Sequence, residues 1–160
     1  MYKRQVGFGV VDYIGGKFSV KDFGAITTDK DTPFPKRLCE IYEDYCQILD
    51  SWKPDALSIE RLYFTNNQKT GIDVAQARGI IIMAAAQRGI EINEYTPLQV
   101  KQAVVGYGQA VKKQVQEMTK NILKLSCVPK PDDTADALAM TICHAQTSGS
   151  LLRNIKASNI

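Results

Sequence analysis

Three carboxylates in two separate stretches of the sequence could bind a divalent cation. Glu60 comes near the end of the apolar run 54–61 (PDALSIER), which has the length and boundaries of a buried strand. A carboxylate that emerges from an apolar strand costs free energy unless it is paired or bound to a cation. Asp133 and Asp136 are three residues apart, so they share one face of a helix. Carboxylate oxygens suit Mg²⁺ or Mn²⁺, although acids in a first helical turn also act as simple caps.

Basic and aromatic residues could supply contacts to a polyanion. The basic residues gather in the C-terminal half, at Lys101, Lys112, Lys113, Lys120 and Lys124, with Arg78 and Arg88 upstream. Two of these lysines flank 106–108 (GYG), where small residues let a backbone approach a phosphate just before a helix N-terminus. Tyr63 and Phe64 directly follow the strand and could stack on bases. The alternatives are a solvated lysine face and ordinary core packing of the aromatics.

Composition limits the kind of protein without naming its function. The chain has 160 residues, 44% hydrophobic and 23% charged, which is ordinary for one globular domain. A net charge of +3 permits a polyanionic partner but does not require one. The four cysteines lack C-x-x-C spacing and there is one histidine, which argues against a zinc site and for reduced thiols in a cytosolic protein. No apolar segment approaches the about 20 residues that span a bilayer, and no export signal begins the chain.

The elements that must position these residues can be read from periodicity. Two β-rich runs, 6–12 and 17–27, flank a Gly-Gly turn and predict a hairpin. Helical spacing predicts helices over 34–52, 70–87, 97–104, 112–125 and 134–146, and alternation predicts a second strand over 90–95. The order predicts an α/β fold in which an antiparallel ribbon joins parallel strands. The region 1–148 is predicted to be the domain, and 149–160 a loose polar tail.

The helix predicted over 70–87 is rich in glycine and alanine. Small residues on one face allow another helix to approach closely. The sequence leaves open whether this face packs inside the domain or contacts a second subunit.

Together the motifs resemble RuvC, the family of bacterial Holliday-junction resolvases. The resemblance rests on 58–60 (SIE), 75–79 (AQARG), 99–101 (QVK), 104–108 (VVGYG), 112–116 (KKQVQ) and 133–139 (DTADALA), in the same order. It extends from about residue 6 to residue 148. It implies a ribonuclease H-like fold with a mixed sheet, a homodimer, and cytoplasmic cleavage of four-way DNA junctions in recombination and repair, with a branch-migration motor complex as a further partner.

The resemblance also implies roles for single residues. Two divalent metals, Mg²⁺ or Mn²⁺, would be held by four acids, of which three match Glu60, Asp133 and Asp136. Lysines at the positions of Lys101 and Lys112, with Lys113 beside them, would contact DNA, and the aromatic at Tyr63 or Phe64 would stack in the opened junction. Two such metals activate the attacking water and stabilise the leaving oxygen.

One departure concerns the fourth acid. The family begins with a central strand ending in Gly-Ile-Asp-Pro-Gly, about ten residues ahead of the segment that matches 6–10. Here only residues 1–5 precede that segment, and none is acidic. Asp12 is a poor substitute because it falls at the far end of the next strand. We therefore expect an N-terminally truncated member that is poorly stable and does not cleave DNA. The alternatives are a DNA-binding module without nuclease activity and a ribonuclease H-like protein of other chemistry.

Overall fold

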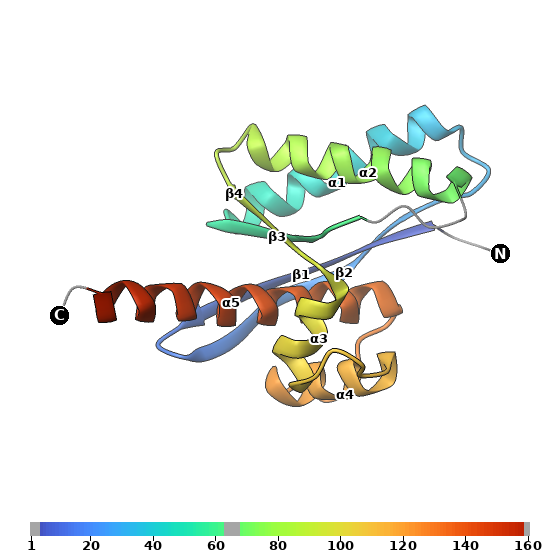
Figure 1. The fold of residues 1–160 in the computed structure, drawn as a ribbon. Helices are drawn as coiled ribbons and strands as arrows, with labels where there is room; N and C mark the ends of the chain where they lie inside the picture. Colours follow the sequence, from blue (N-terminus) through green and yellow to red (C-terminus); the bar gives the residue numbers. More distant parts are fainter. Residues whose placement is uncertain (1–3, 63–67, 159–160) are drawn as a thin grey trace.

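The computed structural model describes residues 4–62 and 68–158, and it begins with a long hairpin (Figure 1). Strands β1 (Arg4–Ile14) and β2 (Lys17–Thr28) are antiparallel, with Ile14 opposite Lys17. Gly15 and Gly16 form the turn, and both have positive φ, 58° and 78°. Glycine adopts this conformation without strain, and a two-residue turn of this kind matches the twist of the paired strands. The predicted hairpin is confirmed.

Two further strands form a separate parallel pair. In β3 (Ala56–Glu60) and β4 (Glu91–Tyr95), Ala56 lies opposite Glu91 and Glu60 opposite Tyr95. Helix α2 (Gln68–Ala86) lies in the crossover that a parallel pair requires. Within residues 4–62 and 68–158, the hairpin and this pair are two sheets without a shared hydrogen-bonded ladder. The antiparallel and parallel strands of the predicted α/β fold are thus both present, but the single mixed sheet is divided in two.

Helices cover the strands on both sides. Helix α1 (Phe34–Trp52) packs with α2 on one side, and α5 (Asp132–Ser158) runs along the other, with α3 (Pro97–Val105) and α4 (Lys112–Ile122) next to its N-terminal half (Figure 1). One core cluster lies under α1 and α2 and contains Ile26, Ile41, Tyr45, Leu49, Ile81, Ala84 and Ala85. A second lies among α3, α4 and α5 and includes Val104, Val115, Leu138 and Ile142.

Two helix boundaries differ from the sequence-based prediction. Helix α4 ends at Ile122, because Lys124 adopts a left-handed conformation (φ 55°). This turn lets both Leu123 and Leu125 reach the core. Helix α5 begins at Asp132 and continues to Ser158, so the expectation of a loose tail after Ser148 is wrong for the backbone. The tail contains no proline, and its leucine, alanine, lysine and arginine residues favour helix.

The structure also bears on the expectations about disulfides and membrane spans. All four cysteines are free thiols, at Cys39, Cys46, Cys127 and Cys143. In the part of the chain that the structure describes, no helix combines the length and apolar character needed to cross a bilayer.

Candidate functional site

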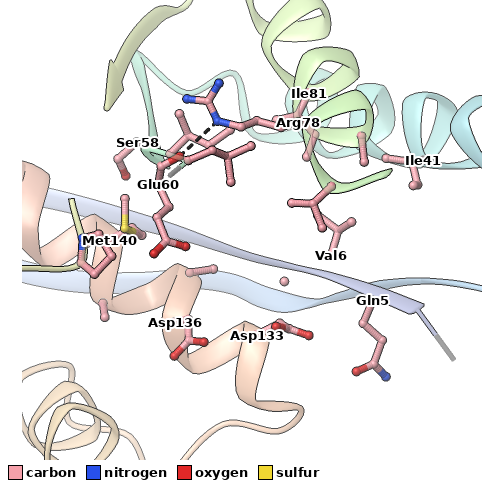
Figure 2. A pocket seen from close by; sticks show the side chains of 18 of the residues that line it. Gln5, Val6, Ile41, Ser58, Glu60, Arg78, Ile81, Asp133, Asp136 and Met140 are labelled. Atoms are coloured by element: carbon pink, nitrogen blue, oxygen red, sulfur yellow. Dashed lines mark hydrogen bonds between the residues drawn. The ribbon is translucent and has the colours of Figure 1, made fainter. Parts of the chain in front are cut away.

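A cavity of about 550 Å³ separates the two sheets, and the predicted acids line it (Figure 2). On one side lie Gln5, Val6 and Gly7 of β1, and on the other Ser58, Ile59 and Glu60 of β3. Residues of α1 and α2 form one wall, and the first turns of α5 form another. Glu60, Asp133 and Asp136, referred to below as the three cavity carboxylates, therefore reach one space from a strand and a helix far apart in the sequence.

The end of β3 is held in place by Arg78 of α2. Its Nε donates a hydrogen bond of 3.1 Å to the backbone carbonyl of Glu60, drawn as a dashed line in Figure 2. The same guanidinium pairs with Glu94 of β4 at 2.9 Å, and Arg61 pairs with the other oxygen of Glu94 at 3.3 Å. The N–H of Arg61 also donates to the carbonyl of Tyr95. These contacts fix the backbone that carries the Glu60 carboxylate.

Close packing of α5 on the hairpin positions the two aspartates. A Cβ on Gly7 would overlap the backbone carbonyl of Asp133, and one on Gly9 would overlap the side chain of Leu138. The absence of side chains at these two positions lets the helix lie directly on β1. The buried Thr134 hydroxyl then donates to the carbonyl of Gly24 at 2.9 Å. The first turn of α5 is therefore fixed against β1 and β2.

The carboxylates at the cavity repel one another. Partial desolvation, followed by the charge of Asp136, raises the pKa of Glu60. The pKa of Asp133 is also raised, first by desolvation and then by the charge of Asp136. Both shifts mean that the surroundings disfavour the ionised carboxylate, which a nearby cation would reverse.

The two lysines expected to contact DNA also line the cavity. Lys101 comes from α3, and Lys112 is the first residue of α4. The Lys112 ammonium lies 3.3 Å from Oδ2 of Asp136 and 3.5 Å from Oδ2 of Asp132. Partial desolvation lowers the pKa of Lys112, but the charges and hydrogen bonds of Asp136 and Asp132 outweigh this effect and raise it. Lys113 is exposed and is not among the residues that line the cavity.

The donor set suits a divalent cation in its chemistry but is not a closed coordination shell. The three cavity carboxylates provide oxygen ligands, which Mg²⁺ and Mn²⁺ prefer, and the raised pKa values of Glu60 and Asp133 show charge that a cation would neutralise. Within residues 4–62 and 68–158, however, no three His, Cys, Asp or Glu side chains are gathered closely enough to hold one ion. Asp12 of β1 does not complete the set, because it pairs with Lys21 at 3.4 Å and does not line the cavity.

The other residues predicted to contact DNA are the aromatics after β3 and the turn 106–108. Tyr63 and Phe64 lie outside the described residues. Gly106 has φ 98° and caps α3, while a Cβ on Gly108 would overlap the Leu98 side chain. Gly106 is thus required by the turn itself, whereas the exposed Leu98 side chain has room to move away from a Cβ on Gly108. The Tyr107 hydroxyl donates to Gln114 at 3.0 Å, which ties the turn to α4.

The sequence profile of the family described as Crossover junction endodeoxyribonuclease RuvC matches residues 2–144. The chain belongs to the RuvC family. The RuvC of Ruminiclostridium cellulolyticum is 53% identical over 150 residues, which cover 92% of this chain and 90% of that protein. The RuvC of Alkaliphilus oremlandii is 51% identical over 142 residues, or 89% of this chain and 87% of that protein.

Solved structures agree with this assignment. The chain is similar to Thermus thermophilus RuvC in complex with a Holliday junction substrate, with a TM-score of 0.83 and 32% identity, covering 88% of this chain and 86% of that one. A second Thermus thermophilus RuvC structure gives a TM-score of 0.77 at 31% identity, covering 87% and 84%. The predicted ribonuclease H-like fold is confirmed. The cavity lies between the hairpin and the Glu60 strand, which is where the resemblance places the first strand of RuvC.

Sequence analysis did not identify Arg37 as a residue of this RuvC cavity. Arg37 is only 6% exposed and lines the cavity, and its Nε donates to the Thr28 hydroxyl at 3.1 Å. The carbon between its guanidinium nitrogens lies 5.6 Å from the centre of the Phe34 ring. A signal was present, because Arg37 precedes Ile41, Tyr45 and Leu49 at intervals of four on the buried face of α1. A basic residue at a core position of an amphipathic helix indicates a buried charge.

Proposed function

We propose that this chain acts on four-way DNA junctions as a metal-dependent endonuclease. The observation that carries the proposal is the meeting of the three cavity carboxylates with Lys101 and Lys112 at one cavity. Acids that bind a metal and lysines that bind phosphate are the two components that phosphodiester hydrolysis requires. The Thermus thermophilus protein with the similar fold is described as bound to a Holliday junction substrate, which supports the choice of DNA.

Each residue has a separate part in this function. The three cavity carboxylates would hold Mg²⁺ or Mn²⁺, which activates a water molecule and stabilises the leaving oxygen when bound. Lys101 and Lys112 bind the phosphate beside the cleaved bond, and Lys113 contacts the DNA backbone from the exposed side of α4. Arg78 keeps Glu60 directed at the cavity through its carbonyl. Tyr63 and Phe64 stack on bases of the opened junction.

The outer face of α2 supports a homodimer. The inner face buries Ala84 and Ala85 against the core, whereas Ile72 and Met83 on the opposite face are exposed, Ile72 by 54%. A Cβ on Gly79 would meet no atom within 4 Å. Exposed apolar and small side chains on one helix allow close contact with a second copy. We expect Ile72→Glu to shift the protein from dimer to monomer in analytical ultracentrifugation, whereas Ile14→Glu at the exposed hairpin tip leaves the dimer intact.

A second candidate function is junction binding without cleavage. Four acids line the cavity among the described residues, but the fourth, Asp73, belongs to α2, whereas the resemblance to the family implies an acid on the first strand. The acid of β1, Asp12, is paired elsewhere with Lys21. A metal site with fewer ligands has looser geometry, while the phosphate contacts of the lysines are unaffected. This candidate corresponds to the inactivity expected from the sequence.

One experiment distinguishes the two candidates. The purified chain is incubated with a labelled mobile four-way junction or the matching linear duplex, with Mg²⁺ or EDTA, at several salt concentrations. Both candidates predict preference for the junction, with log affinity falling against log salt by about 0.9 per phosphate neutralised. Paired metal-dependent nicks that disappear in Glu60→Gln support the endonuclease. Binding without nicks supports the second candidate, and equal affinity for both DNAs contradicts both.

A cytoplasmic location and a branch-migration motor complex as partner are further parts of the proposal. They follow from the resemblance to the RuvC family. Co-purification of the motor with this chain on junction DNA would test the partner.

A further inference from the structure

Lys112 occupies the position of a cation beside the acids of α5. Its ammonium contacts Asp136 at 3.3 Å and Asp132 at 3.5 Å. Asp132 has a second partner, since the Lys130 ammonium lies 3.1 Å from its other oxygen. Among the described residues, Asp136 pairs with no other cationic side chain. The contact between Lys112 and Asp136 is therefore the one that neutralises a carboxylate of the proposed metal site.

Lys112 and Lys101 differ in this respect although both line the cavity. Within residues 4–62 and 68–158, Lys101 forms no ion pair, so its ammonium is available to a phosphate. Lys112 is held by two carboxylates. It also begins α4, so its backbone is anchored while its half-exposed side chain can swing between neighbouring partners. The position of its charge therefore depends on what else binds Asp136.

A divalent cation and the ammonium compete for the same carboxylate. A cation that takes Oδ2 of Asp136 must break the ion pair, and a cation that takes the other oxygen lies within a few ångströms of a like charge. Both groups are half-exposed, so the dielectric around them is close to that of water. Under these conditions the loss of the ion pair and the repulsion between the cation and the ammonium together weaken cation binding by roughly tenfold. Release of the ammonium relieves this repulsion and leaves it unpaired beside the cavity.

We propose that Lys112 is an intramolecular counterion that a divalent cation displaces from Asp136, and that the displaced ammonium then binds the DNA phosphate. The inference rests on the proposed function because it requires a cation at the three cavity carboxylates. It adds that cation binding and junction binding are coupled through Lys112. Coupling of this kind is reciprocal, so DNA that captures the ammonium also strengthens cation binding.

The first test measures Mn²⁺ affinity by isothermal titration calorimetry, without DNA. Lys112→Met removes the competing charge and lowers the Mn²⁺ dissociation constant by roughly tenfold. Lys112→Arg keeps the charge and leaves the constant within about twofold. Lys120→Met is the matched control, because Lys120 lies on the same helix in an ion pair with Glu117 at 2.9 Å but away from the cavity. It changes net charge equally and leaves the Mn²⁺ constant unchanged.

The second test measures junction affinity in EDTA and in Ca²⁺. The dissociation constant in EDTA divided by that in Ca²⁺ measures the coupling between cation and junction binding. This ratio is roughly fivefold smaller in Lys112→Met than in the unmodified chain, and fivefold is the lower end of the range usual for such coupling. Lys120→Met keeps the full ratio. Circular dichroism of each variant verifies that it is folded.

The outcomes separate this inference from the proposed function. Mn²⁺ binding that is unchanged or weaker in Lys112→Met overturns the inference and leaves the metal-dependent function standing. An equal effect of Lys112→Met and Lys120→Met also overturns it, because net charge would then explain the change. Mn²⁺ binding by none of the proteins overturns both. Binding gained or tightened in Lys112→Met alone supports both.

Discussion

The three cavity carboxylates are placed so that one of them, Asp136, raises the cost of ionising the other two. Asp136 raises the pKa of both Glu60 and Asp133, from different elements of the fold. Lys112 offsets part of this repulsion through Asp136. At the scale of single residues, the repulsion that remains between these carboxylates is what a bound divalent cation would relieve.

Removing any one of these carboxylates should weaken cation binding without weakening DNA binding. We expect Glu60→Gln, Asp133→Asn and Asp136→Asn each to raise the Mn²⁺ dissociation constant by about tenfold or more, because each change removes a charged oxygen ligand. Junction affinity in EDTA should stay the same or increase, since a charge that repels phosphate is lost. Asp12→Asn is the control, because Asp12 does not line the cavity. Unchanged Mn²⁺ affinity in any of the three variants would show that its residue is not a ligand.

His144 gives the stability of the protein a dependence on pH. Desolvation lowers the pKa of His144, and its Nδ1 shares a 2.7 Å hydrogen bond with the Tyr95 hydroxyl. The unfolded chain takes up the proton near its ordinary pKa of about 6.5, whereas the folded chain does so at lower pH. The contribution of His144 to the free energy of unfolding is therefore fully present above the pKa of the unfolded chain. It is lost as the pH falls from there towards the lower pKa of the folded chain.

Urea unfolding from pH 8 to pH 5 tests this expectation. The free energy of unfolding should decrease with falling pH below about 6.5. In His144→Gln this part of the decrease should vanish, because glutamine does not titrate. Parallel pH profiles for the two proteins would contradict the assignment.

At the scale of elements, the packing of α5 on β1 determines where the two aspartates lie. Gly7 and Gly9 provide the close approach, and the Thr134 hydroxyl adds a buried hydrogen bond to β2. On the other side of the cavity, Arg78 links α2 to the ends of both parallel strands. Each sheet thus has its own connection to the site.

Gly7→Ala should displace α5 and disturb the site. The added Cβ would overlap the Asp133 carbonyl, which belongs to the backbone and has no freedom to rotate away. We expect a loss of about 1–3 kcal/mol in the free energy of unfolding, as for other overpacked positions, together with weaker Mn²⁺ binding. Gly71→Ala is the matched control, because a Cβ there meets no atom within 4 Å on a helix.

The control should behave in the opposite way. Replacing a helical glycine that has room for a methyl group stabilises a protein by about 0.4–1 kcal/mol. Thermal unfolding of the two variants alongside the unmodified chain gives the comparison. Equal stability of Gly7→Ala and the unmodified chain would show that α5 can move away from β1 without cost.

At the scale of the whole molecule, the cavity separates the two sheets of the fold. The hairpin and the parallel pair share no ladder in the part that the structure describes, and about 550 Å³ lies between them. Backbone groups on the facing edges of β1 and β3 have no strand partner across this space. Each buried group left unpaired costs about 1–3 kcal/mol, and several such losses rival the about 5–15 kcal/mol that stabilises a domain.

The chain of residues 1–160 should therefore be poorly stable. We expect a broad thermal transition with a midpoint below the about 45–65 °C that is usual for mesophilic domains. Circular dichroism at 222 nm during heating is the measurement. A sharp, cooperative transition within the usual range would show that the two sheets support each other despite the cavity.

The sequence by itself determined the elements and the chemistry of their residues. The helix predicted over 34–52 has the bounds of α1, and the Gly-Gly turn predicted the hairpin. These features depend on contacts between residues a few positions apart, which periodicity records directly. The sequence also showed that Glu60, Asp133 and Asp136 are carboxylates suited to a metal. The order of the motifs that contain them indicated the family.

Tertiary structure alone decided how these residues meet. The ion pair of Lys112 with Asp136, the buried position of Arg37 and the contact between Gly7 and Asp133 join segments that periodicity treats separately. The early end of α4 was also beyond local propensity. Such contacts depend on how strands and helices pack, and packing is fixed by the burial of residues distant in sequence rather than by any local pattern.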